Sequence, residues 1–312
     1  MKTIFLLLGT FPLLFSQTVN IPSYFRNNSL LAEKLRRAVS DLKLDKGFDT
    51  GEDGIVYPSL AVVDLSGTIP RFAGVNPDSF IYPASVYKMY VAAEVLHQVS
   101  EGKYFLASPF IVKSPNDVDR SREIESDPRP LLRGGDTVSV NYLLDLMITR
   151  SDNSAANCLI DLARRENINA MIGRYGWNGS EVTRKYLSRK LEDSGYAAVK
   201  STATCALHAA DFMYRIYTNQ LFNPWVSMQM RTFLGRQLDN TKLAAGLPDS
   251  AMFYHKTGWY ASWTHDVGIV DDGTVRYIIS CLLPLPEEIA KPKMKELSKR
   301  VYELLNKNKK RF

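Results

Sequence analysis

Several features that mark a particular fold or function class are scarce in this chain of 312 residues. It has 3 cysteines and 4 histidines, the cysteine spacings form no metal-binding pattern, and no segment repeats at a fixed period. Its composition, 45% hydrophobic and 23% charged, is that of an average soluble globular chain. These values argue against a disordered, collagen-like or many-span membrane protein, and we expect neither a metal nor a cofactor.

An apolar segment, residues 4–15, follows Met1-Lys2-Thr3. A charged start and a short apolar stretch are typical of a secretory signal, and the stretch is too short for a comfortable membrane span. We therefore expect an exported protein, periplasmic or secreted, with a signal peptide over residues 1–17. Residues 18–312 would form a single domain that consists of an α/β lobe and a helical lobe. Ser16 and Gln17 form a poor cleavage site, so an uncleaved membrane anchor is the alternative. No cysteine follows the segment, which excludes lipoprotein attachment there.

The net charge of +6 is concentrated at the end of the chain. From Lys291 onward there are nine Lys or Arg and two Glu, so the remainder is close to neutral. This distribution gives no reason to expect a nucleic-acid partner. A solvated basic tail is the simplest interpretation, and contact of this C-terminal tail with a membrane or an anionic wall polymer is the alternative.

The three cysteines, Cys158, Cys205 and Cys281, each lie in an apolar stretch. We expect buried free thiols, with a single disulfide among them as the alternative.

Periodicity outlines elements at both ends of the chain. Ser29 is a plausible N-cap for a helix to about Leu42. Two β-like segments, 59–65 and 70–75, are joined by the turn signal Ser66-Gly67. Near the other end, β-like segments are expected at 252–256, 265–270 and 276–283. A terminal amphipathic helix is expected at 287–305.

The middle of the chain is mainly helical by its pattern. A long apolar run over 87–99 predicts a buried helix, and residues 104–137 predict a loop with short helical pieces. Residues 173–201 are aperiodic, which indicates a long excursion of the kind that is often functional. The remaining expected helices cover 140–147, 154–165, 202–219 and 225–238.

This order predicts an α/β (α+β) fold. N- and C-terminal segments, about 18–80 and 242–312, would complete one antiparallel sheet flanked by helices. An all-helical lobe, about 81–241, would be inserted between them, which favours a cleft between the two lobes.

Three short motifs occur in order: Ser85-Val86-Tyr87-Lys88, Ser151-Asp152-Asn153 and Lys256-Thr257-Gly258. They match S-x-x-K, S-D-N and K-T-G. Each alone is common, but the set is informative because the order is correct and each motif falls in a suitable element.

With these motifs, and with Pro83-Ala84 and Asp266-Val267-Gly268 beside them, the sequence resembles the class A serine β-lactamases and the penicillin-binding proteins. The resemblance implies an acyl-enzyme on Ser85 and an oxyanion hole made by the N–H groups of Ser85 and Trp259. It also implies proton relay through Ser151, an Asn153 contact to the substrate amide, and a carboxylate held by Lys256 and Thr257, with Gly258 and Trp259 also in the substrate-binding strand.

The residues themselves favour the same chemistry. Ser85 and Lys88 are three apart at a helix start and face the same way, so the amine can approach the hydroxyl. A lysine becomes a base when burial and a second cation lower its pKa, and Lys256 would be that cation. Asp152 is expected to point back into the helical lobe, and His255 to pack away from the cleft.

The pattern departs from class A β-lactamases in two places. Val182-Thr183-Arg184 resembles the start of the loop that carries their water-activating glutamate, but ungapped continuation puts Arg189 at that position. Glu192 is then a possible alternative base, although a solvated charge is its simpler role. In addition, the large Trp259 follows K-T-G and would narrow the cleft.

Three functions follow as hypotheses. The first is an exported acyl-transfer enzyme that is penicillin-binding-like, acts on D-alanyl-D-alanine peptides or β-lactams, and deacylates slowly. The second is a β-lactamase with an unusual deacylation base. The third is a non-catalytic wall-peptide binding protein, which the intact nucleophile and lysines disfavour.

Overall fold

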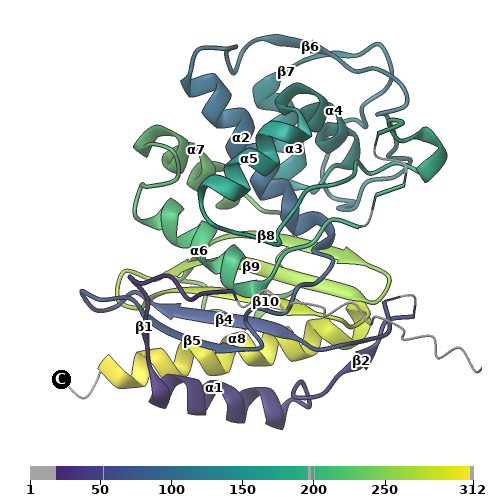
Figure 1. Cartoon of the computed structure of the whole chain (residues 1–312). Coiled ribbons are helices and arrows are strands. Elements are labelled where there is room, and N and C mark those ends of the chain that lie inside the picture. The colour runs from purple at the N-terminus through teal and green to yellow at the C-terminus, as the bar shows by residue number, and fades with distance from the viewer. Residues whose placement is uncertain (1–18, 52, 196–197, 200, 310–312) are drawn as a thin grey trace, which may run out of the picture.

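The computed structural model describes residues 19–309 apart from 52, 196–197 and 200. The predicted signal peptide therefore lies outside the described residues. A six-stranded sheet is the centre of the lower half of the molecule in Figure 1. Its strand order is β1 (Arg26–Asn27), β5 (Arg71–Val75), β4 (Ser59–Asp64), β10 (Arg276–Leu283), β9 (Trp263–Asp271) and β8 (Met252–Tyr260).

Strands from both ends of the chain meet at the β4–β10 pair, which is antiparallel with Val63 opposite Ile278. The β4–β5 hairpin is also antiparallel, as the Ser66-Gly67 turn predicts. Only the short β1 runs parallel to its neighbour. The predicted sheet of N- and C-terminal segments is thus confirmed.

Two layers of helices cover the two faces of the sheet. On one face lie α1 (Ser29–Asp41) and α8 (Glu287–Lys309), seen in purple and yellow in Figure 1. Their apolar stripes, including Leu35, Val39 and Leu297, pack with Leu60 and Tyr277 of the sheet into one core. Burial of a continuous apolar stripe explains why these helices form.

The opposite face packs against α6 (Ala206–Tyr217), and its strands β8 and β9 also contact the helical half of the molecule directly. Helix α2 (Lys88–Ser100) runs through the centre of this half, and its residues from Lys88 to Leu96 are all buried. The long apolar run in the sequence is explained by contacts on every side of this helix. The helices around it are α3 (Val140–Thr149), α4 (Asn153–Ala163), α5 (Arg165–Arg174) and α7 (Pro224–Leu234).

The structure corrects several local predictions. Asn28, not Ser29, caps α1, since its side chain accepts from the Leu31 N–H. The described residues 101–136 contain no helix; instead β6 (Pro109–Ile111) pairs with β7 (Thr137–Ser139). Helix α5 was not predicted, because its stretch of charged and polar residues shows little apolar periodicity.

The smaller elements are a two-stranded pair, β2 (Phe48–Asp49) with β3 (Ile55–Val56), and three 3₁₀ turns, η1 (Ala84–Tyr87), η2 (Arg189–Leu191) and η3 (Leu243–Gly246). The three cysteines are free and buried, as expected. Among the described residues, no helix is both long and apolar enough to span a membrane.

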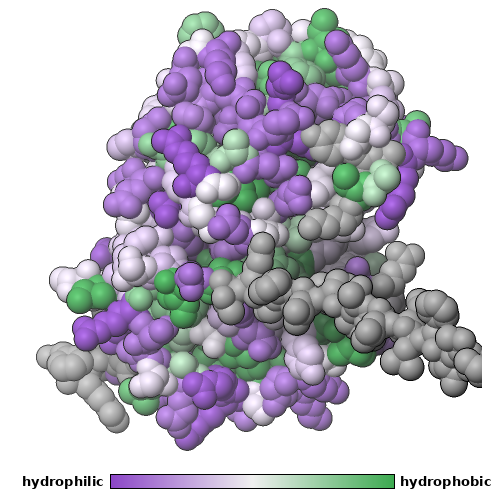
Figure 2. Space-filling view, in the orientation of Figure 1, coloured by the Kyte–Doolittle hydropathy of each residue, from purple (hydrophilic) through white to green (hydrophobic). Residues whose placement is uncertain are grey.

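The basic C-terminal segment is an ordered helix and not a solvated tail as far as Lys309. Several of its cations are paired within the protein: Lys291 with Glu287, and Arg300 with both Glu296 and Asp41. Figure 2 shows hydrophilic side chains gathered along the lower edge of the molecule, over α1.

Candidate active site

Ser85 lies in the sharp turn that leads into the start of helix α2. It belongs to η1, directly before Lys88 begins α2, and is 9% exposed. The preceding Ala84 has φ 45°, in the left-handed region that costs energy for residues with a side chain. This turn presents the Ser85 side chain at the boundary between the helical half and the sheet.

Strand β8 approaches this turn at Gly258. A Cβ placed on Gly258 would lie 2.8 Å from the Ser85 nitrogen and 2.9 Å from the Val86 nitrogen. Only glycine allows so close an approach, which explains the third residue of the K-T-G motif. The contact places β8 directly against the backbone of the Ser85 turn.

Two buried lysines meet at Ser151. Its hydroxyl oxygen accepts from Lys256 Nζ at 3.0 Å and from Lys88 Nζ at 3.3 Å. Lys88 Nζ also donates to the Ser151 carbonyl oxygen and to Asn153 Oδ1, the latter at 2.8 Å. Lys256 Nζ donates to the Thr257 carbonyl oxygen at 2.7 Å. The three motifs are thus brought together as predicted.

The surroundings of the lysines favour the loss of a proton. Both side chains are 0% exposed. Burial lowers the pKa of Lys88 to about 8, and burial together with the nearby Lys88 charge lowers the pKa of Lys256 to about 7. The carboxylate of Glu123 acts on both pKa values in the opposite direction. Such strongly perturbed groups are typical of functional sites.

The expected contact between the Ser85 hydroxyl and the Lys88 amine is not formed. No hydrogen bond joins these two side chains, because the amine is engaged by Ser151 and Asn153. A proton can still pass between Ser85 and the lysines once a ligand reorganises these contacts, since hydrogen bonds in ligand-free sites are often long.

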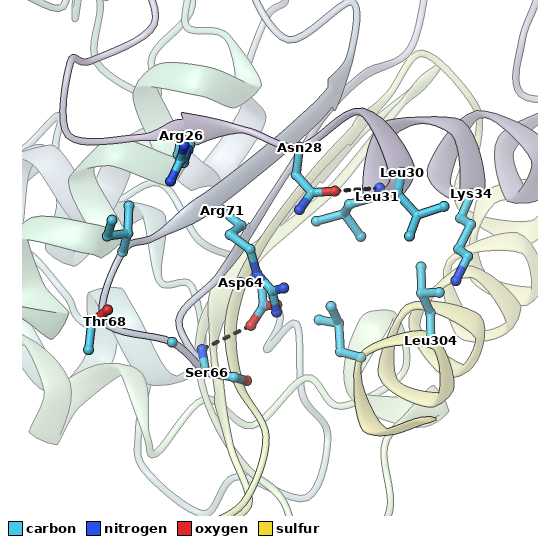
Figure 3. Close-up of a pocket in the computed structure, with 13 residues that line it drawn as sticks. Arg26, Asn28, Leu30, Leu31, Lys34, Asp64, Ser66, Thr68, Arg71 and Leu304 are labelled. Atoms are coloured by element: carbon cyan, nitrogen blue, oxygen red, sulfur yellow. Dashed lines mark hydrogen bonds and ion pairs between the residues drawn. The ribbon is translucent and has the colours of Figure 1, made fainter. Parts of the chain in front are cut away.

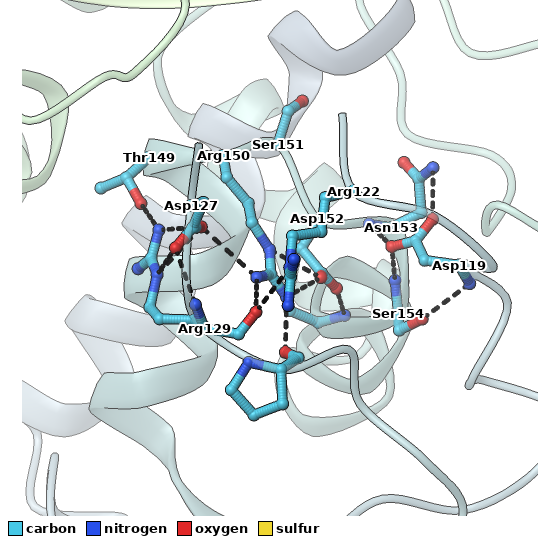
Figure 4. A network of polar contacts seen from close by, with 12 residues as sticks. Asp119, Arg122, Asp127, Arg129, Thr149, Arg150, Ser151, Asp152, Asn153 and Ser154 are labelled. Carbon is cyan, nitrogen blue, oxygen red and sulfur yellow. Dashed lines mark hydrogen bonds and ion pairs between the residues drawn. The ribbon is translucent and has the colours of Figure 1, made fainter. Parts of the chain in front are cut away.

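Asn153 is held from two sides. Its Oδ1 accepts from Lys88, while its Nδ2 donates to Asp119 Oδ1 at 3.0 Å. The other carboxylate oxygen of Asp119 accepts from the backbone N–H groups of Asn153 and Ser154 at 2.7 and 3.1 Å. Figure 4 shows Asp119 at one side of this network. Asp119 therefore fixes the start of α4, and sequence patterns gave no signal for it.

A second cluster fixes the backbone on the other side of Ser151, whose φ is 64°. Arg150, 2% exposed, donates to Asp152 Oδ2 at 2.8 Å and to the carbonyl oxygens of Arg129 and Pro130. Asp152 also caps α4 through the Ala155 N–H. Figure 4 shows these contacts tying the 127–130 segment to the motif. The structural role expected for Asp152 is confirmed.

His255 also lies where expected, away from the two lysines. It is 1% exposed, its Nδ1 lies 2.8 Å from Asp266 Oδ1, and its ring stacks on Phe253.

Neither residue proposed for the position of the water-activating carboxylate is available there. Arg189 is exposed on η2. The Glu192 side chain is 0% exposed and is bound to Arg165 Nη1 at 2.7 Å and to the Lys185 N–H at 3.2 Å. The expectation that Glu192 is a solvated charge is wrong. The cost of burying its carboxylate is compensated by the ion pair with Arg165.

Tyr186, in the same loop, reaches Lys88. Lys88 Nζ lies 4.4 Å from the centre of its ring. No motif marked Tyr186, since aromatic residues in an aperiodic loop are usually interpreted as packing.

Trp259 extends from the end of β8 toward the loop of the helical half. It is 45% exposed, and its Nε1 donates to Glu123 Oε1 at 2.9 Å. The indole thus bridges the two halves of the molecule, which agrees with the expected narrowing of the cleft. Next to it, the Thr257 hydroxyl is buried with no hydrogen-bond partner among the described residues.

The described residues contain no group of three His, Cys, Asp or Glu side chains placed to hold a metal ion. A pocket of about 640 Å³ lies elsewhere, between α1, the β4–β5 turn and the end of α8, lined by residues such as Leu30, Arg71 and Leu304 (Figure 3). It includes none of the motif residues.

Residues 35–305 match the model of the Beta-lactamase enzyme family. This match spans most of the chain, and the chain therefore belongs to that family, which makes it a serine hydrolase of the β-lactamase and penicillin-binding superfamily. No curated protein matches the sequence.

Solved structures show the same fold at low sequence identity. PBP-A is 20% identical with a TM-score of 0.75, covering 92% of this chain and 100% of its own. A β-lactamase from Sphaerobacter thermophilus is 18% identical with a TM-score of 0.73, covering 88% and 97%. An ancestral class A β-lactamase is 22% identical with a TM-score of 0.71, covering 88% and 99%.

The approach of β8 to the Ser85 turn generates a stability prediction. Gly258→Ala inserts a methyl group against backbone nitrogens and should lower the free energy of unfolding by about 1–3 kcal/mol. Gly173→Ala is the control, because no atom lies within 4 Å of its added Cβ in α5, and it should stabilise slightly. Urea denaturation compares the two; equal effects would contradict the close packing at Gly258.

Proposed function

We propose that the protein is an exported serine acyl-transfer enzyme that forms an acyl-enzyme on Ser85 with a β-lactam or a D-alanyl-D-alanine-type peptide and releases it slowly. The observation that carries the proposal is the convergence of Lys88 and Lys256 on the Ser151 hydroxyl beside the Ser85 turn. A pure binding protein gains nothing from two buried lysines with lowered pKa values next to a serine.

In this proposal the Ser85 oxygen attacks the carbonyl carbon of the substrate, which donates its acyl group to the serine. A neutral Lys88 takes the serine proton, and Ser151 passes a proton on to the leaving nitrogen. The negative charge on the carbonyl oxygen is stabilised by the N–H groups of Ser85 and Trp259. The donor carboxylate is held by Lys256 and by the free hydroxyl of Thr257.

Asn153 contacts the amide of the donor in this account. Its side chain is already hydrogen-bonded to Lys88 and Asp119. Substrate binding therefore replaces one of these hydrogen bonds by a hydrogen bond to the substrate. The cost of that exchange is small, because a hydrogen bond is replaced by a hydrogen bond.

Slow release follows from the missing water-activating carboxylate. Hydrolysis of an acyl-serine needs a group that accepts a proton from the attacking water. An arginine such as Arg189 cannot accept it, and Glu192 is buried against Arg165. Because these contacts remove Glu192 from the role of base, the β-lactamase alternative has less support than the penicillin-binding-like function. The solved acyl-enzyme of a PBP-A variant with penicillin G, 20% identical, TM-score 0.74 and covering 90% of this chain and 98% of its own, lends the proposal support by analogy.

The direct test is incubation with excess benzylpenicillin followed by intact-mass spectrometry. We expect an adduct of one drug mass that persists for minutes after the free drug is removed, and no adduct with Ser85→Ala. Lys88→Ala should form it about 10²–10⁴-fold more slowly, as expected for loss of a general base. Rapid return to the unmodified mass with release of many equivalents of product would support the β-lactamase alternative instead.

The lowered lysine pKa values predict the pH dependence of acylation. Because Lys88 must be neutral to take the serine proton, the rate should rise with pH as the lysine pair loses its first proton, near pH 7–8. Glu123→Gln removes a carboxylate that raises both pKa values, so the rising limb should move to lower pH. Stopped-flow acylation between pH 5 and 9 measures this, and an unchanged or upward-shifted limb would contradict the assignment.

The Lys256→Met variant separates the role of Lys256 in binding the substrate carboxylate from its effect on the stability of the protein. Loss of a charge-assisted contact of about 1.5–3 kcal/mol should reduce acylation by benzylpenicillin at least about tenfold, with a smaller effect on its methyl ester. The variant should nevertheless melt at a higher temperature at pH 6, because the burial penalty of a second cation disappears. That gain should shrink as pH rises from about 7 toward the ordinary lysine pKa of about 10, because the wild-type pair then holds one cation fewer in the folded protein. Equal loss for acid and ester would place the carboxylate elsewhere.

Export remains part of the proposal, supported by the composition of residues 1–17. Contact of the basic C-terminal segment with a membrane or an anionic wall polymer is likewise proposed, on its excess of Lys and Arg.

A further inference from the structure

Tyr186 lies against both the Ser85 turn and the Lys88 amine. Its ring lies over Lys88 Nζ at 4.4 Å and stacks on the ring of Tyr87 with centroids 5.2 Å apart and planes within 4°. Its phenol donates to the Ala84 carbonyl oxygen at 3.3 Å. The Ser85 hydroxyl lies close enough to the phenol to lower its pKa, against the larger raising effect of burial. The side chain therefore touches both motif residues from the loop side.

The backbone of Tyr186 is held as firmly as its ring. The Asn157 side chain, 0% exposed on α4, accepts from the Tyr186 N–H at 2.7 Å and donates to its carbonyl oxygen at 3.3 Å. A residue clamped by a buried amide and by ring stacking cannot swing away without losing several contacts. Tyr186 is thus a fixed wall of the site.

This wall is chemically unsuited to hydrolysis. A water that attacks an acyl-enzyme needs two or more polar partners and a group to accept its proton. Lys88 Nζ is surrounded by Ser151, Asn153 and the face of the Tyr186 ring, and a ring face does not replace those partners. Burial raises the pKa of Tyr186 well above its usual value, so the phenol stays protonated and is no base.

We propose that the Tyr186 ring occupies the position from which water would attack an acyl group on Ser85, and that this residue sets the lifetime of the acyl-enzyme. The inference rests on the proposed function and goes beyond it, because it assigns slow release to a specific side chain and not only to an absent carboxylate. Tyr186 also orients Lys88 through its ring, and is in that respect a positioning residue.

The step that Tyr186 blocks is acyl transfer to water. In that step the water oxygen bonds to the acyl carbon, the bond from that carbon to Ser85 Oγ breaks, and the water proton passes through a base to the serine oxygen. Substituting Tyr186 by alanine opens room for the water, with Lys88 beside it. Substituting it by glutamate supplies the base as well.

The test measures the lifetime of the benzylpenicillin adduct by intact-mass spectrometry, with acylation rates measured separately. Tyr186→Phe is the matched control: it keeps the ring and its stacking, and its adduct should persist within about twofold of wild type. We expect Tyr186→Ala to shorten the lifetime at least about tenfold, and Tyr186→Glu by about 10²-fold or more, the range for an added general base.

The outcomes separate the two proposals. Absence of any adduct in wild type would overturn the proposed function, and this inference with it. A long-lived wild-type adduct that lasts equally long in Tyr186→Ala and Tyr186→Glu would overturn this inference alone. The separately measured acylation rates report any general loss of structure. If Tyr186→Ala fails to fold, Tyr186→Glu against Tyr186→Phe decides the question by the same criterion.

Discussion

The structure of the site depends on burying two ammonium groups next to each other. Desolvation of one lysine is costly, and a second cation nearby adds repulsion. The protein compensates with acceptors at fixed positions: the Ser151 hydroxyl and carbonyl, Asn153 Oδ1 and the Thr257 carbonyl. The remaining cost appears as lowered pKa values of the lysines. The same burial that destabilises the charged lysines therefore prepares one of them to act as a base near neutral pH.

Much of the surrounding fold serves to hold those acceptors. Ser151 and Ala84 both have left-handed backbone angles, and such residues persist only where neighbouring contacts fix them. The buried Arg150–Asp152 pair and the Asp119 carboxylate fix the segment around Ser151. On the opposite side, the absence of a side chain at Gly258 lets β8 approach the Ser85 turn. The strained backbone at Ser151 and Ala84 is thus held in place by ion pairs in the helical half and by packing against the sheet.

The sequence was sufficient for the fold class, the sheet of N- and C-terminal strands and the meeting of three motifs, because periodicity and motif order depend on local residues. It was insufficient for contacts that depend on the path of a loop. Arg189 and Glu192 were placed by counting, whereas the loop turns Arg189 outward, buries Glu192 on Arg165 and directs Tyr186 to Lys88. Glu123 and Asp119 were missed for the same reason: a carboxylate in an aperiodic loop has no pattern that shows where it points.

The central claim is that an acyl group is transferred to Ser85 quickly and to water slowly. A burst experiment with a chromogenic cephalosporin in excess over the protein tests it most directly, because each acylation releases one signal. The account predicts a rapid burst whose amplitude equals the concentration of protein, followed by a nearly flat phase, with no burst in Ser85→Ala. Sustained linear turnover of many equivalents without a burst would contradict it.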